Sequence, residues 1–145
     1  MLRLQWRNLI GWALVAALPL AGSWARRQAG DGCALDGVPI ESRYRVRIVA
    51  APGPSHEFCC IRCAQAWQQH GAGSAASVFV TDEASGEEVA ASQATYVRST
   101  VITTPTSGNR VHTFARPEDA ERHAETCHGT VLPDQARPFE SRPNE

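Results

Sequence analysis

Three cysteines lie within five positions of the sequence, at Cys59, Cys60 and Cys63. A short extended stretch, Glu57–Cys60, leads into a helical pattern that starts at Cys60, so the thiols sit where a strand end turns into a helix. A helix N-terminus lowers the pKa of a thiol, because the helix dipole stabilises the thiolate. Thiolate is the form of cysteine that binds soft metal ions such as Cu(I) or Zn(II). The spacing therefore predicts a metal site at this helix start.

Two residues outside this run are further candidate ligands. Cys33 lies upstream, next to Gly32 and before Asp36-Gly37, as expected for a metal-binding knuckle, and His56 directly precedes the cysteine run. The predicted metal ligands are Cys33, Cys59, Cys60, Cys63 and His56. A disulfide between Cys33 and one of the three clustered cysteines is the alternative, and the odd total of five cysteines leaves at least one thiol without an intrachain partner.

A second group, His123-x-x-x-Cys127-His128, has a spacing that places His123 and Cys127 on one face of a predicted helix. Histidines at a helix end are more often solvated and complement the helix dipole, and we expect that role here. His112, in a short predicted strand, is expected to be half-buried rather than a ligand.

Residues 1–27 have the composition of a targeting segment. Arg3 and Arg7 precede a run without charge, Asn8–Ala25, which ends in small residues. This pattern is typical of a secretory signal peptide, and an uncleaved membrane anchor is the other interpretation. Both interpretations predict that the rest of the chain lies outside the cytoplasm, in the periplasm or cell envelope, with membrane association through this segment if it is retained.

The remaining chain alternates strand and helix patterns. Two helices are expected, one from Cys60 to the stop at Gly71–Ser74 and one from Pro117 to Gly129. Strands are expected within Tyr44–Ile48, Ser77–Thr81, Thr95–Thr103, Val111–Ala115 and Val131-Leu132, while Val89–Ala94 fits a helical turn. The two strand-then-helix units Tyr44–His70 and Val111–His128 suggest a loose duplication. Residues 140–145 read as a frayed tail.

Composition limits the class of function. The chain has 145 residues and a formal net charge of −1, which supports one domain and argues against a nucleic-acid partner. The acidic pairs Glu87-Glu88 and Glu118-Asp119 read as solvated residues rather than a catalytic pair. A thiol oxidoreductase is an alternative, but no βαβ pattern surrounds the Cys-x-x-Cys spacing. The sequence therefore predicts a binding protein rather than an enzyme.

Several motifs in order resemble the NosL family, the accessory proteins of nitrous oxide reductase. They are Phe58-Cys59-Cys60-x-x-Cys63, Val80-Thr81-Asp82-Glu83-x-Ser85-Gly86-Glu87, Ala94-x-Tyr96-Val97-x-Ser99, Gly108-x-Arg110-x-His112-x-Phe114 and Asp119-Ala120 with the later Gly129. The resemblance covers roughly 32–139, and the spacing Cys33…Cys59-x-x-x-Cys63 is also similar to the cysteine motif of heavy-metal trafficking domains.

The resemblance implies a small α+β domain of two β-β-α-like lobes. It also implies a copper(I)-binding accessory protein or metallochaperone that delivers metal to a cuproenzyme or its assembly complex, the client. The chain departs from the family in two ways: it lacks a lipidation cysteine, and Thr104-Pro105-Thr106 stands where the family often has Thr-Pro-Met. Since Met1 is the only methionine, copper binding would depend on cysteine and histidine. A structural zinc domain and a disulfide-stabilised binding module remain the alternatives.

Overall fold

The computed structural model describes residues 32–70 and 75–139. The chain divides between Asp31 and Gly32 into two units, and the described residues belong to the second. The predicted signal or anchor at 1–27, the predicted helix stop at 71–74 and the predicted tail at 140–145 lie outside the described residues. Among the helices of the described part, none is long and apolar enough to cross a membrane.

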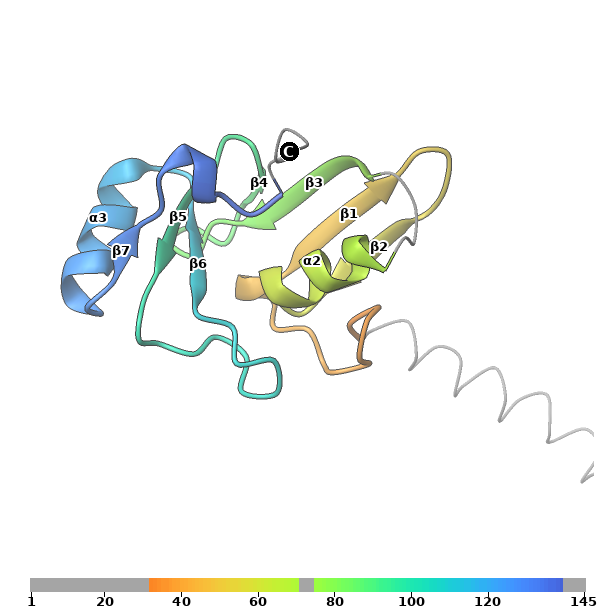
Figure 1. The fold of residues 1–145 in the computed structure, drawn as a ribbon, viewed down its shortest axis with the longest axis horizontal. Helices are drawn as coiled ribbons and strands as arrows, with labels where there is room; N and C mark the ends of the chain where they lie inside the picture. The colour runs from red at the N-terminus through yellow and green to blue at the C-terminus, as the bar shows by residue number, and fades with distance from the viewer. Residues whose placement is uncertain (1–31, 71–74, 140–145) are drawn as a thin grey trace, which may run out of the picture. The chain divides into compact units, whose positions relative to one another are not determined.

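The first lobe is a four-stranded antiparallel sheet with one helix (Figure 1). Its strands, in the order β2-β1-β3-β4, are β1 (Val46–Ala50), β2 (Ser55–Phe58), β3 (Ala75–Thr81) and β4 (Glu88–Ala90). Helix α2 (Ile61–Gln69) follows β2 directly and packs against β1 and β2, and a short 3-10 turn, η1 (Ser42–Tyr44), precedes β1. The first residue of β2 is exposed and the last, Phe58, is fully buried, so the strand carries the chain into the core just before the cysteines.

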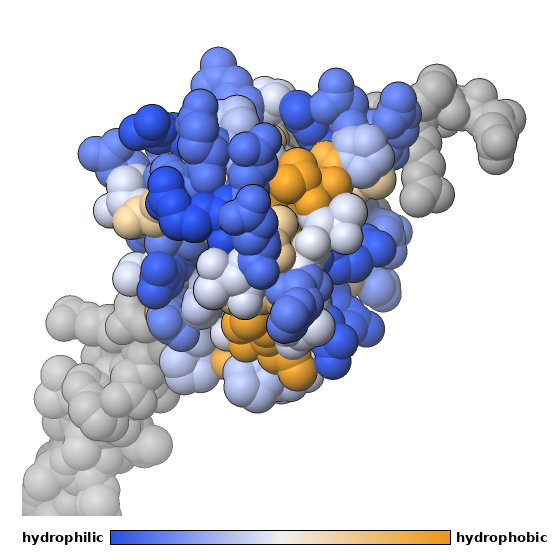
Figure 2. Space-filling view, turned by 90° about the vertical axis from the view of Figure 1, so that its left-hand side faces the viewer, coloured by the Kyte–Doolittle hydropathy of each residue, from blue (hydrophilic) through white to orange (hydrophobic). Residues whose placement is uncertain are grey.

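The second lobe is a three-stranded antiparallel sheet with a helix of its own. The sheet has the order β6-β5-β7, formed by β5 (Thr95–Arg98), β6 (Val111–Phe114) and β7 (Thr130–Val131). Helix α3 (Pro117–Thr126) packs on these three strands, and η2 (Asp134–Ala136) follows. Pro117 occupies the first turn of α3, where its missing N–H costs nothing, and two acidic residues follow it. This side of the molecule is largely hydrophilic, with small separate hydrophobic patches (Figure 2).

These lobes confirm the predicted fold class, a small two-lobed α+β domain with β-β-α-like units. Each lobe follows the same β-β-α-β path, β1-β2-α2-β3 and β5-β6-α3-β7, with its first strand in the middle of the three. The duplication is therefore present, but its second unit begins at β5 rather than at Val111. Periodicity identified β5 as a strand but did not show that it pairs with β6.

The repeat also extends to side chains. His56, Phe58 and Ala64 of the first lobe have identical residues 56 positions later in the second: His112, Phe114 and Ala120. In the first lobe Trp67 packs on His56 and Phe58, with ring centroids 4.8 and 5.4 Å apart. In the second lobe His123 takes the place of Trp67 and packs on His112 and Phe114 at 4.2 and 5.2 Å.

Some sequence expectations differ from the structure. Val89–Ala94 is an ambiguous stretch that would fit a helical turn, but Val89 pairs with Val80 across β3 and β4, because the hairpin that closes at Gly86 brings the two strands into register. The strand expected within Thr95–Thr103 occupies only the first part of that range and ends at Arg98, because the Ser99 hydroxyl accepts a hydrogen bond from the Val101 N–H and turns the chain. His123 was expected to be solvated but is half-buried against aromatic rings, and its pKa is lowered by burial and by the nearby His112.

A buried carboxylate joins the two lobes. Glu83, in the turn after β3, is 7% exposed, and its Oε1 accepts a 3.1 Å hydrogen bond from the Thr113 N–H of β6. Its Oε2 lies 2.9 Å from Nδ1 of His112, which is 1% exposed rather than half-buried as expected. The Glu83 N–H donates in turn to the Thr113 carbonyl at 2.9 Å. This bonding fixes the end of β3 against β6.

We predict that Glu83→Ala lowers the free energy of unfolding by about 2–4 kcal/mol, because it leaves the buried Thr113 N–H and His112 Nδ1 without their acceptor. Urea denaturation at neutral pH measures this change. The control is Glu87→Ala in the same turn, whose side chain is exposed and which should change the unfolding free energy by less than about 0.5 kcal/mol. Equal effects of the two substitutions would contradict a joining role for Glu83.

Candidate metal centre

A tight loop places Cys33 beside the end of β2. The Cys33 N–H donates to the Val38 carbonyl and the Gly37 N–H donates to the Cys33 carbonyl, both at 2.8 Å. Gly37 has a φ of 72°, a conformation that glycine adopts without steric cost and that closes this loop. The Ala34 N–H donates to the Glu57 carbonyl at 2.8 Å, which attaches the loop to β2.

The other two thiols come from the junction between β2 and α2. Cys59 follows the last residue of β2, and Cys63 lies in the first turn of α2. Their sulfur atoms are 3.6 Å apart. The junction is held from the opposite side, where the Thr104 hydroxyl donates to the Cys59 carbonyl at 3.4 Å. Backbone geometry thus places the two thiols side by side.

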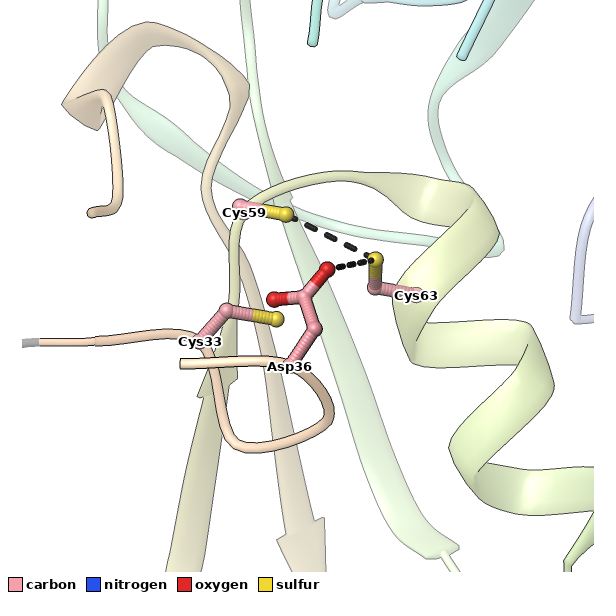
Figure 3. Close-up of side chains that lie close together, drawn as sticks. All are labelled: Cys33, Asp36, Cys59 and Cys63. Atoms are coloured by element: carbon pink, nitrogen blue, oxygen red, sulfur yellow. Dashed lines mark hydrogen bonds between the residues drawn. The ribbon is translucent and has the colours of Figure 1, made fainter. Parts of the chain in front are cut away.

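Cys33, Cys59 and Cys63, here named the thiol cluster, converge with Asp36 on one point (Figure 3). The sulfur atoms and a carboxylate oxygen of Asp36 all lie within 4.8 Å of one another. The thiol cluster is buried, with each residue at most 3% exposed, whereas Asp36 is exposed. A metal–thiolate bond of about 2.3 Å sets two sulfurs of one ion roughly 3.8–4.0 Å apart. The donor spacing therefore matches what one metal ion requires.

Burial keeps the Cys59 and Cys63 thiols protonated. It raises the pKa of Cys59 and of Cys63 well above that of an ordinary thiol, and the charge of Cys60 adds to the effect in both. The expectation from sequence that the helix start lowers these pKa values is therefore wrong. The physical reason is that the loss of water around the sulfurs disfavours the thiolate more than the α2 dipole favours it.

Asp36 accepts hydrogen bonds from two of the thiols, those of Cys33 and Cys63. Burial pushes the pKa of Asp36 upward, but hydrogen bonds from the Cys33 thiol, the Val38 N–H and the Cys63 thiol outweigh it and leave the pKa below the ordinary value. The Cys63 sulfur lies 3.4 Å from Asp36 Oδ2. A bound metal ion would replace these protons as the partner of the sulfurs, and each thiol would lose its proton to water.

Of the five predicted ligands, the structure brings three together. Cys60 stands outside the group: it is the N-cap residue of α2, and its sulfur lies 3.1 Å from the Ser107 hydroxyl. His56 also stands outside, because its ring packs on Trp67. The alternation of side chains along β2 gave a signal for this, since His56 shares a strand face with Phe58 and not with Cys59.

Asp36 is the donor that the ligand prediction missed. Its signal was its position three residues after Cys33 and directly before Gly37, within one turn. Sequence spacing placed Cys33 in a knuckle, but only the closed turn shows that the carboxylate at its tip faces the thiols. All five cysteines are free thiols in this structure.

A cavity of about 220 Å³ adjoins Cys59. It is lined by Val38, Pro39, Glu41, Cys59 and the run Thr103–Thr106. Thr106 stands where the resembling family often has methionine, so that loop position does lie near the thiol cluster. In this chain it contributes a hydroxyl group instead of a thioether.

Fold and site together define a small two-lobed α+β domain with a group of side chains that could hold a metal ion. Comparison with protein-family models and with curated proteins finds no match. Among solved structures, the fold is similar to that of the copper chaperone NosL from Shewanella denitrificans, with a TM-score of 0.63 and 18% sequence identity. The match covers 74% of this chain and 90% of that one. The fold that the sequence resemblance implied is therefore confirmed.

The raised thiol pKa values predict how metal-free stability depends on pH. A thiol whose pKa is higher in the folded than in the unfolded state stabilises the fold below its unfolded pKa, and this contribution is lost as the pH rises. The unfolding free energy of the reduced, metal-free protein should thus fall between about pH 8 and 10, since an unfolded thiol ionises near 8.5.

Urea denaturation across this pH range tests the prediction, with a Cys59→Ser/Cys63→Ser double variant as control. The control should lose less stability over the same interval, because its hydroxyl groups do not ionise there. Parallel curves for the two proteins would show that these thiols have ordinary pKa values in the folded state.

Proposed function

We propose that this chain is an extracytoplasmic copper(I)-binding accessory protein, a metallochaperone that delivers Cu(I) to a cuproenzyme or its assembly complex. The observation that carries the proposal is the thiol cluster, three buried sulfurs within 4.8 Å of one another and of the Asp36 carboxylate. The fold shared with a copper chaperone supports the same assignment.

The donor set favours Cu(I) over harder ions. Soft thiolate ligands select Cu(I) and zinc, whereas carboxylate and water ligands suit Mg²⁺ or Ca²⁺. Three thiolates satisfy Cu(I) without a fourth ligand. Zinc, the alternative, would require a closed tetrahedral site, for which Asp36 would have to supply the fourth donor. Asp36 is exposed and lies on a loop, so its carboxylate is open to water rather than enclosed.

Transfer requires that a ligand of the receiving protein can reach the ion. The Asp36 side of the site is exposed, and the cavity beside Cys59 offers a second approach from the Thr103–Thr106 loop. An ion held by three thiolates keeps a position open for an incoming ligand, so it can be passed on by exchange. Such a role uses metal binding and release and needs no catalytic residue.

The setting outside the cytoplasm rests on the sequence of 1–27. A signal peptide or membrane anchor there would deliver the domain to the periplasm or cell envelope, and an anchor would hold it at the membrane surface. In that compartment thiols are exposed to oxidation, and a Cys59–Cys63 disulfide would block the site. A disulfide-stabilised binding module without metal is therefore the alternative function that experiments must distinguish from that of a metallochaperone.

We predict that Cys59→Ser and Cys63→Ser each weaken Cu(I) binding by more than about 100-fold, because each removes one of three ligands. Competition with bathocuproine disulfonate under anaerobic, reducing conditions measures the affinity. Cys127→Ser is the matched control, since Cys127 lies at the end of α3 and outside the donor group, and it should bind like the wild type.

Two results would overturn the proposal. One is Cu(I) affinity that is unchanged in the Cys59 and Cys63 variants. The other concerns the wild-type protein purified without reductant. Mass spectrometry would show its clustered cysteines paired in disulfides, and the protein would not bind Cu(I) after reduction. Tighter binding of Zn(II) than of Cu(I), lost in Asp36→Asn, would favour the zinc alternative.

A further inference from the structure

Cys60 contacts the thiol cluster without belonging to it. Its sulfur lies 3.9 Å from that of Cys59, and Cys60 contributes to the raised pKa of the Cys63 thiol. Cys60 is 1% exposed. It stands outside the group whose donor atoms all lie within 4.8 Å of one another, the group that contains Cys33 and Asp36. Cys60 is therefore a neighbour of Cys59 and Cys63 that does not share the full set of contacts of Cys33.

Two sets of three buried sulfurs share the Cys59–Cys63 pair, here called the shared edge, whose sulfurs are 3.6 Å apart. One set adds Cys33. The other, here called the second triangle, adds Cys60, whose sulfur lies 3.9 Å from that of Cys59. The Cys59–Cys63 and Cys59–Cys60 separations of 3.6 and 3.9 Å are close to the roughly 3.8–4.0 Å between two sulfurs on one metal ion.

Cys60, the sulfur that belongs only to the second triangle, is contacted by the loop that contains Ser107. The Ser107 hydroxyl lies 3.1 Å from the Cys60 sulfur and also donates to the Thr104 carbonyl at 3.3 Å, which fixes the serine within its loop. A polar hydroxyl group of this loop therefore contacts Cys60.

The thiol donors select a soft ion for this second position, as they do for the first. A Cu(I) ion brings one positive charge, and the Cys60 thiol that binds it loses one proton to water, so the step adds no net charge to the buried site. A second divalent ion would repel its neighbour across the shared edge more strongly than a second Cu(I) ion would. Thiolate sulfur has lone pairs enough to bridge two soft ions.

We infer that Cys60 creates a second Cu(I) position, in which Cys59 and Cys63 bridge two copper ions and Cys33 and Cys60 each complete one. This inference rests on the proposed function, because it requires that the thiol cluster binds Cu(I). It assigns to Cys60 a role separate from that of Cys33. The chain would then carry two copper ions per molecule.

Anaerobic titration of the reduced full chain with Cu(I), with bathocuproine disulfonate as indicator of free copper, tests the inference. The wild type should take up two equivalents and Cys60→Ser one. Cys127→Ser should keep two equivalents and controls for the loss of a thiol elsewhere. Circular dichroism checks that each variant is folded.

X-ray absorption of the wild type loaded with two equivalents gives a second readout that needs no variant. Copper–copper scattering at short range is expected if two thiolates bridge the ions. A wild type that saturates at one equivalent, or two equivalents without copper–copper scattering, would overturn the shared-edge position and leave the proposed function intact. A Cys60→Ser protein that binds no copper would also overturn it, whereas a wild type that binds none would refute the proposed function itself.

Discussion

The structure depends on one constraint: the thiol cluster is buried together, away from water. Sulfurs placed this close cannot all ionise without a cation between them, and burial raises the pKa of Cys59 and Cys63 accordingly. Without metal, the exposed Asp36 carboxylate accepts hydrogen bonds from the Cys33 and Cys63 thiols. With metal, the ion would supply the compensating charge. Burial disfavours the thiolates in the metal-free protein, and the same burial favours their pairing with a soft ion. Because the thiols must lose protons when they bind the ion, the metal affinity depends on proton release.

The two lobes use one β-β-α-β path for different purposes. In the first lobe, the junction between β2 and α2 carries the cysteines of the site. At the equivalent junction of the second lobe, the residues 56 positions after Cys59, Cys60 and Cys63 are Ala115, Arg116 and Asp119. None of these is a soft ligand, so the second lobe has no counterpart of the site. Its repeated core residue His112 instead lies against Glu83, which attaches the second lobe to the first. The first lobe thus carries the candidate metal site, and the second lobe has a structural role.

Much of the fold followed from sequence because it depends on local patterns. The apolar alternation of β1 and β3, the helix start after Cys60 and Pro117 at the start of α3 each act over a few residues. The site was only partly predictable. Cys33 and Cys63 are separated by a whole hairpin, and their spacing still identified them. The position of Asp36 beside the thiols depends on the turn closed by Gly37, and the position of Cys60 depends on the extended backbone of the α2 N-cap. The raised thiol pKa values depend on burial. Sequence spacing reveals none of these features.

The central claim is that the thiol cluster, and not histidine, holds the metal. X-ray absorption at the copper edge, on reduced protein loaded with one equivalent of Cu(I), tests it most directly because it identifies the atoms bound to copper. We expect about three sulfurs bound to copper at a single short distance, with no imidazole scattering. A first shell dominated by nitrogen, or imidazole scattering from a ligand such as His56, would contradict it.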